Sequence, residues 1–149
     1  MNPTTKLKMT WNVILALLTA TLLMTGGVVL AKSIDCTGGP CVGTKKADTF
    51  RGSGGADQIF GRGGSDSIDS GEGDDEVRGG GGNDTLIDNL PVRDVDTIFG
   101  GKGNDEIDVR EGAAGGDNPD FVDCGPGIDT VFVDPTDTRL NCEFLNPRD

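Results

Sequence analysis

The sequence predicts an all-β repeat fold with a thin core, and three observations support this. Apolar residues make up only 34 % of the chain, whereas an ordinary globular domain contains roughly 45–50 %. Glycine occupies 25 of the 149 positions, and aspartate recurs every nine residues through the middle of the chain. An apolar residue follows each of these aspartates two positions later, as expected where one face of a short strand is buried. A thick two-layer core is therefore not expected.

Residues 1–31 precede the repeats and have the pattern of an export signal. Two lysines come before an uncharged apolar run over residues 13–24, and short apolar residues end at Ala31, where signal peptidase would cut. We therefore expect cleavage after Ala31 and a secreted, extracellular protein. The alternative is an uncleaved membrane anchor, because residues 13–30 are just long enough to span a bilayer.

The composition argues against several functions. The chain has no His, which excludes His-ligated zinc and Ser–His or Cys–His catalytic pairs. It also has no G-x-S-x-G motif, so we expect no enzyme. Acidic residues number 25 against 13 basic ones, which gives a net charge of −12. This charge argues against nucleic acid as a partner and favours cations.

Nine aspartates mark the repeat. They are Asp48, Asp57, Asp66, Asp75, Asp84, Asp96, Asp105, Asp120 and Asp129. The apolar residues two positions after them are Phe50, Ile59, Ile68, Val77, Leu86, Ile98, Ile107, Val122 and Val131. The unit that starts at Gly100, GGKGNDEID, shows the complete pattern.

These units resemble the nonapeptide G-G-x-G-x-D-x-U-x, with U apolar, of secreted bacterial calcium-binding proteins of the hemolysin or repeat-in-toxin (RTX) type. The resemblance covers Asp48 to Val131. It implies a parallel β-roll, which is a β-solenoid with two nonapeptides in each coil and calcium bound between glycine-rich turns. Turn carbonyls and carboxylates are the hard oxygen ligands that calcium prefers. The turn glycines implied in calcium binding are Gly52, Gly55, Gly61, Gly64, Gly71, Gly73, Gly79, Gly80, Gly82, Gly100, Gly101, Gly103, Gly125 and Gly127.

A coil of two nonapeptides places aspartates on top of one another. Asp57 would stack over Asp75, and Asp66 over Asp84, about 4.8 Å apart. Unit charges at that distance repel by roughly 1 kcal/mol in water and by several times more in a partly dry site. A divalent cation between the turns reverses this interaction, so we expect several calcium ions whose binding is coupled to folding. Without calcium the chain should be expanded.

All nine aspartates are candidate metal ligands, but their turns differ in quality. The pairs expected to bind best join well-formed glycine turns: Asp57 with Asp75, Asp66 with Asp84, and Asp84 with Asp105. Three others are weaker candidates. Lysines replace turn residues before Asp48, glycine is missing before Asp96, and Asn replaces the fourth-position glycine before Asp120.

The repeat divides the mature chain into three parts. We expect an N-terminal cap with a small disulfide loop over residues 32–47, the calcium-binding roll over 48–133, and a C-terminal cap over 134–149. Two insertions break the nine-residue period, so loops are expected near residues 87–95 and 108–119. They either recognise a partner or are tolerated surface insertions.

Four cysteines in an exported chain predict disulfides rather than a metal cluster or a redox site. The cysteines alone leave three disulfide connectivities possible. On the coil of 18 residues that the resemblance implies, Cys124 and Cys142 should stack within disulfide distance. Cys36 and Cys41 bracket the flexible segment TGGP and form the second predicted pair. Leu140 comes nine residues after the last core position and is expected to extend the core.

These features predict a free-standing, secreted RTX-type β-roll that binds calcium and acts as a monomer. The alternative is an extracellular adhesive or matrix component that uses the same roll as a scaffold to bind a protein or a glycan. Regular rows of exposed Thr or aromatic residues would favour adhesion, and we do not find them in the sequence.

Overall fold

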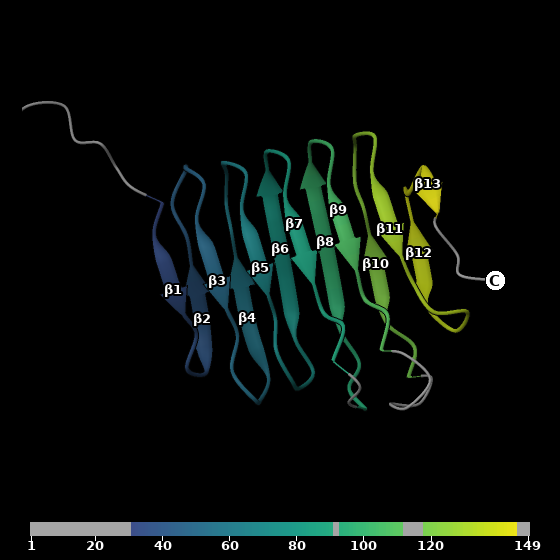
Figure 1. Cartoon of the computed structure of the whole chain (residues 1–149), viewed down its shortest axis with the longest axis horizontal. Helices are drawn as coiled ribbons and strands as arrows, with labels where there is room; N and C mark the ends of the chain where they lie inside the picture. Colours follow the sequence, from purple (N-terminus) through teal and green to yellow (C-terminus); the bar gives the residue numbers. More distant parts are fainter. Residues whose placement is uncertain (1–30, 91–92, 112–117, 146–149) are drawn as a thin grey trace, which may run out of the picture. The chain divides into compact units, whose positions relative to one another are not determined.

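The computed structural model describes residues 31–90, 93–111 and 118–145. Residues 1–30 of the predicted export signal, and with them the anchor alternative, lie outside the described residues. In the described part of the chain, no helix is long and apolar enough to cross a membrane. All of the regular secondary structure there is β-strand, in two parallel sheets (Figure 1).

Consecutive strands alternate between the two sheets, so that each coil of the chain adds one strand to each of them. The seven-stranded sheet contains β1 (Ser33–Asp35), β3 (Thr49–Arg51), β5 (Ser67–Asp69), β7 (Thr85–Ile87), β9 (Glu106–Asp108), β11 (Thr130–Phe132) and β13 (Phe144–Leu145) in that order. The six-stranded sheet contains β2 (Gly39–Val42), β4 (Asp57–Phe60), β6 (Glu76–Gly81), β8 (Thr97–Lys102), β10 (Phe121–Asp123) and β12 (Thr138–Leu140). The arrangement is a parallel β-solenoid of about six turns, which confirms the predicted fold class.

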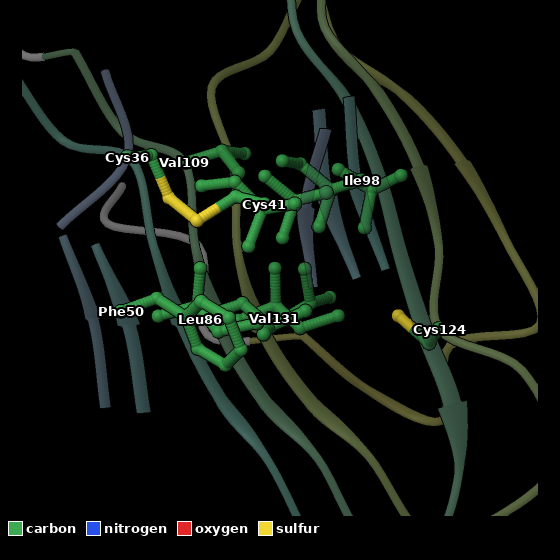
Figure 2. Packing of buried hydrophobic residues seen from close by; sticks show 13 residues of the cluster. Cys36, Cys41, Phe50, Leu86, Ile98, Val109, Cys124 and Val131 are labelled. Atoms are coloured by element: carbon green, nitrogen blue, oxygen red, sulfur yellow. A yellow bond between two sulfur atoms is a disulfide. The ribbon is translucent and has the colours of Figure 1, made fainter. Parts of the chain in front are cut away.

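The core is a double row of apolar side chains, with one row from each sheet. The second residue after each repeat aspartate points inward, and all nine of these residues are at most 2 % exposed. Figure 2 shows Phe50, Leu86 and Val131 of the seven-stranded sheet in one row, with Cys41 and Ile98 of the six-stranded sheet in the other. The core is therefore only two side chains thick, as the low apolar content predicts.

The two insertions leave the strand register intact. In the first coils, the backbone N–H of each repeat aspartate is bonded to the aspartate 18 residues later, for example Asp66 to Asp84. This separation becomes 21 residues from Asp75 to Asp96 and 24 residues from Asp96 to Asp120. The additional residues are thus absorbed between the strands, in the segments where the loops are predicted.

Both predicted disulfides are present. Cys36–Cys41 joins the start of the first coil, and Cys124–Cys142 links two successive coils with a Cα–Cα distance of 5.2 Å. The end strands of both sheets, β1 and β13 of one and β2 and β12 of the other, pair in register with their neighbours, so the coils at both ends of the described chain continue the sheets.

The prediction that Leu140 extends the core is wrong. Leu140 is 48 % exposed and pairs with Asp123, which is an outward position. Arg139, not Leu140, is in register with the core residue Val122. The reason is that the last coil is one residue shorter, because the aspartate that follows Asp120 in the stack lies 17 residues later rather than 18.

Candidate metal centre

The nine repeat aspartates lie on the two edges where the chain passes between the sheets. We call the edge where the chain passes from the six-stranded to the seven-stranded sheet the compact side, and the opposite edge, which carries both insertions, the loop side (Figure 1). The compact side holds Asp48, Asp66, Asp84, Asp105 and Asp129. The loop side holds Asp57, Asp75, Asp96 and Asp120. All nine are at most 3 % exposed.

One oxygen of each aspartate is used to join successive coils. The backbone N–H of Asp66 donates to Oδ1 of Asp84, and the same bond recurs along both sides at 2.7 to 2.9 Å. The stack ends on Asp137 on the loop side and on Glu143 on the compact side. Sequence reasoning missed both residues, because neither keeps the nine-residue spacing.

The second oxygen separates seven of the nine aspartates into two groups. In Asp48 and Asp57, Oδ2 accepts a hydrogen bond from the backbone N–H of Thr44 and Ser53, respectively. Five others have a buried Oδ2 without a hydrogen-bond partner among the described residues. They are Asp66, Asp75, Asp84, Asp105 and Asp129. A buried carboxylate oxygen without a partner is costly, so these five positions are suited to a cation.

The pKa values of several of these carboxyls are shifted by burial and by their hydrogen bonds. Burial raises the pKa of Asp75 to about 7, and repulsion from Asp96 and Asp57 adds to the effect. Burial likewise raises the pKa of Asp84 to about 6 and that of Asp120 to about 7, again with help from neighbouring carboxylates. Burial also acts on Asp48, but hydrogen bonds from Thr44 and Lys32 outweigh it and lower the pKa of that carboxyl.

These shifts predict an inverted pH dependence for the metal-free protein. Because the folded-state pKa values of Asp75, Asp84 and Asp120 lie above the ordinary value near 4, the folded chain holds more protons than the unfolded chain between about pH 4 and pH 7. Metal-free stability should then fall as the pH rises through this window. Far-UV circular dichroism of metal-stripped protein should show more β structure at pH 5 than at pH 8, and the opposite trend would contradict the prediction.

Glycine is required where the aspartates approach the next coil. A Cβ atom on Gly79 would lie 2.5 Å from Oδ2 of Asp84 and 2.6 Å from the carbonyl oxygen of Gly100. Gly61 and Gly100 are in equivalent positions, each against an aspartate Oδ2 and a carbonyl oxygen of the next coil. Glycine therefore keeps open a space bordered by one carboxylate oxygen and one carbonyl oxygen.

Not every predicted turn glycine has such a role. Gly64 and Gly82 have positive φ angles of 104° and 134°, and both lie against the preceding coil. Both the backbone conformation and the lack of space therefore exclude a side chain at these positions. Gly55 has an ordinary φ and open space around its Cβ position, so the structure gives no reason for glycine there. Gly43, which was not predicted, borders Oδ2 of Asp48 and the Gly61 carbonyl oxygen.

The donor set fits a hard cation held jointly by side chains and backbone. No three Asp, Glu or Cys side chains converge on a common point within residues 31–90, 93–111 and 118–145, so carboxylates alone do not form a site there. Carbonyl oxygens next to the unpartnered Oδ2 atoms would have to supply the remaining ligands. Oxygen-only coordination of this kind suits calcium rather than a transition metal.

Comparison with known proteins agrees with this chemistry. Residues 42–77, 51–86 and 93–113 match the sequence profile of the family described as RTX calcium-binding nonapeptide repeat (4 copies). The matched segments contain three of the unpartnered compact-side aspartates, Asp66, Asp84 and Asp105. Comparisons with curated proteins and with solved structures gave no match.

Proposed function

We propose that this chain, which contains RTX calcium-binding nonapeptide repeats, binds several calcium ions between successive turns of the roll and folds as it does so. The observation that carries this proposal is the stack of buried aspartates whose Oδ2 atoms have no partner among the described residues. Each of them lies one coil away from another carboxylate, and the repeat places both in a water-poor edge of the roll. A divalent cation would neutralise this arrangement, which is otherwise repulsive.

The proposed side-chain ligands are the five aspartates with an unpartnered Oδ2, namely Asp66, Asp75, Asp84, Asp105 and Asp129. Asp96 and Asp120 also belong to the stack and are proposed as further ligands. Asp48 and Asp57 should contribute less, since Thr44 and Ser53 already donate to their outer oxygens. Asp57 is therefore expected to bind calcium more weakly than its regular glycine turn suggests.

Binding and folding are expected to be coupled because the core alone is small. The roll buries a double row of side chains, and its edges carry buried carboxylates with raised pKa values. A ligand that binds the folded chain and not the unfolded one stabilises it in proportion to the logarithm of its concentration. Extracellular calcium modules have dissociation constants on the order of 10⁻⁴–10⁻³ M, and we expect the same range for the turn sites.

An Asp84→Asn variant tests the proposed ligands. Asn keeps the Oδ1 acceptor for the Asp66 N–H but removes the charge between two coils. We expect calcium binding at the adjacent turns to weaken by at least about tenfold, as measured by equilibrium dialysis. Asp69→Asn is the matched control, because Asp69 is exposed on the outer face of β5 and its replacement changes the net charge equally. Equal binding by the two variants would contradict the proposal.

Export to an oxidising compartment is part of the same proposal. The two disulfides support it, because such bonds are rare in the cytosol and frequent in small secreted domains. The export signal predicted over residues 1–31 supports it independently.

The adhesive alternative has one observation in its favour, which sequence inspection missed. The strand register brings hydroxyl side chains into an outward row on the seven-stranded sheet, broken by Glu106. The row consists of Ser33, Thr49, Ser67, Thr85 and Thr130. If this face binds a glycan, a Ser67→Lys/Thr85→Lys variant should lose binding on a glycan array while it keeps calcium binding.

A further inference from the structure

Lys32 occupies, at the start of the first coil, the position that a repeat aspartate occupies in the later coils. The backbone N–H of Lys32 donates to Oδ1 of Asp48 at 3.2 Å, as the N–H of Asp48 donates to Oδ1 of Asp66 one coil later. The Lys32 carbonyl oxygen accepts the N–H of Thr49, and the Asp48 carbonyl oxygen accepts that of Ser67 in the same way. The hydrogen-bonded stack of the compact side therefore begins at the Lys32 nitrogen.

The predicted signal-peptidase cut falls directly before this nitrogen. The compact unit that contains the roll begins at Ala31, and the first strand of the described chain begins at Ser33. Cleavage after Ala31 thus leaves every described strand intact. It also converts the Lys32 amide into a free α-amino group, which is mainly an ammonium ion with three donors near neutral pH.

The surroundings of Asp48 suit an ammonium ion better than calcium. The Asp48 side chain is only 3 % exposed, and its Oδ2 already accepts the backbone N–H of Thr44 at 2.6 Å. Lys45 and Lys46 lie exposed in the turn before Asp48, and their charges oppose a divalent ion. A chain that starts at Lys32 has no turn before that residue, so the first aspartate of the compact side lacks one of the two turns between which calcium would bind.

We propose that cleavage after Ala31 completes the N-terminal cap of the roll, because the freed α-ammonium group of Lys32 serves as the cation of Asp48. Signal peptidase hydrolyses the peptide bond between Ala31 and Lys32 with one water molecule, which leaves a carboxylate on Ala31, and the Lys32 amine takes up a proton. The neutral hydrogen bond to Asp48 becomes charge-assisted, and such bonds are roughly twice as strong as neutral ones. The inference rests on the export that is part of the proposed function.

The test compares two purified chains that differ only by Ala31. One chain begins at Lys32 and the other at Ala31, so both have one α-ammonium group and the same net charge, but only the first places this group against Asp48. All described strands lie within both chains. In urea denaturation at saturating calcium, we expect the equilibrium constant for unfolding to be about five- to tenfold lower for the chain that begins at Lys32.

An Asp48→Asn substitution in both chains identifies the partner of the ammonium group, and it should abolish the difference between them. Asp57→Asn is the matched control on the loop side. The Oδ1 of Asp57 accepts the N–H of Gly38, an amide inside both chains, so this substitution should leave the difference unchanged. Equal stability of the two parent chains would overturn the inference, as would a difference that persists in the Asp48 variant.

A second measurement needs no substitution, in case the Asp48 variant does not reach the β signal of its parent. Acetic anhydride should modify the α-amine of the chain that begins at Lys32 more slowly than that of the chain that begins at Ala31, because the ion pair with Asp48 holds the first amine. Mass spectrometry of the N-terminal peptide measures both rates. Equal rates would contradict the inference.

Failure of this inference can be told apart from failure of the calcium function. If both chains gain β signal with calcium but are equally stable, the role of the N-terminus is wrong and the calcium-binding roll stands. If calcium changes neither chain but the one that begins at Lys32 is more stable, the calcium function is wrong and the cap stands. N-terminal sequencing of the secreted protein should begin at Lys32, and any other first residue would overturn the inference.

Discussion

Replacing Gly79 with Ala is expected to remove calcium binding around Asp84 and to destabilise the roll even when calcium is saturating. The added methyl group would lie within 2.6 Å of both Oδ2 of Asp84 and the carbonyl oxygen of Gly100. Forcing a methyl group into a tightly packed site costs about 1–3 kcal/mol, before any loss of bound calcium is counted. Urea denaturation with and without calcium measures both effects.

The control for this variant is Gly55→Ala, in a turn of the same repeat. Gly55 has open space at its Cβ position and an ordinary φ, so the substitution should change the free energy of unfolding by less than about 1 kcal/mol. If the two alanine variants have the same free energy of unfolding, the close approach of the coils does not make glycine necessary at position 79.

An Ile98→Ala variant should be among the most destabilising single changes in the core. Ile98 is 1 % exposed and packs in a core with only two rows of side chains, so little neighbouring structure can collapse into the cavity. Truncation of a buried Ile typically costs about 2–5 kcal/mol. The expected result is a large fall in the urea midpoint at saturating calcium.

The same truncation at Ile128 provides the comparison, because Ile128 is 60 % exposed on a compact-side turn. Its replacement should change stability by no more than about 0.5 kcal/mol. A midpoint for Ile98→Ala that matches the Ile128→Ala midpoint would mean that the apolar rows do not stabilise the roll.

The fold could be predicted from the sequence because one local rule is repeated many times. Each repeat aspartate with its apolar partner fixes a strand, its inward face and its place in the stack, so errors in one unit do not affect the others. The coil of 18 residues predicts the Cys124–Cys142 disulfide correctly, although the coil between these two cysteines is one residue shorter. Both insertions could be located because the period resumes after each of them.

What the sequence could not supply are the features that depart from the period. The last coil is one residue short, which turns Leu140 outward and brings the exposed Arg139 into register with the core residue Val122. Asp137 and Glu143 end the stack at spacings that no repeat indicates. Asp88 and Glu111 look like ordinary loop acids in the sequence, and only their burial sets them apart.

The engagement of individual oxygens was equally beyond the sequence. Asp57 follows a regular glycine turn and looked like one of the best ligands. In the structure, both the N–H and the hydroxyl of Ser53 donate to its Oδ2. A motif records which residue types are present, whereas site quality depends on whether a neighbouring donor already satisfies the carboxylate.

The most direct test of a calcium-dependent roll is far-UV circular dichroism of the purified, disulfide-bonded protein during a calcium titration, with magnesium as the control. Repulsion between stacked carboxylates predicts little β signal in the metal-stripped protein at neutral pH. It also predicts a cooperative gain of β signal with calcium and not with magnesium. A β signal that is already complete in chelator would contradict this, because the aspartates would then be turn residues of a roll that needs no metal.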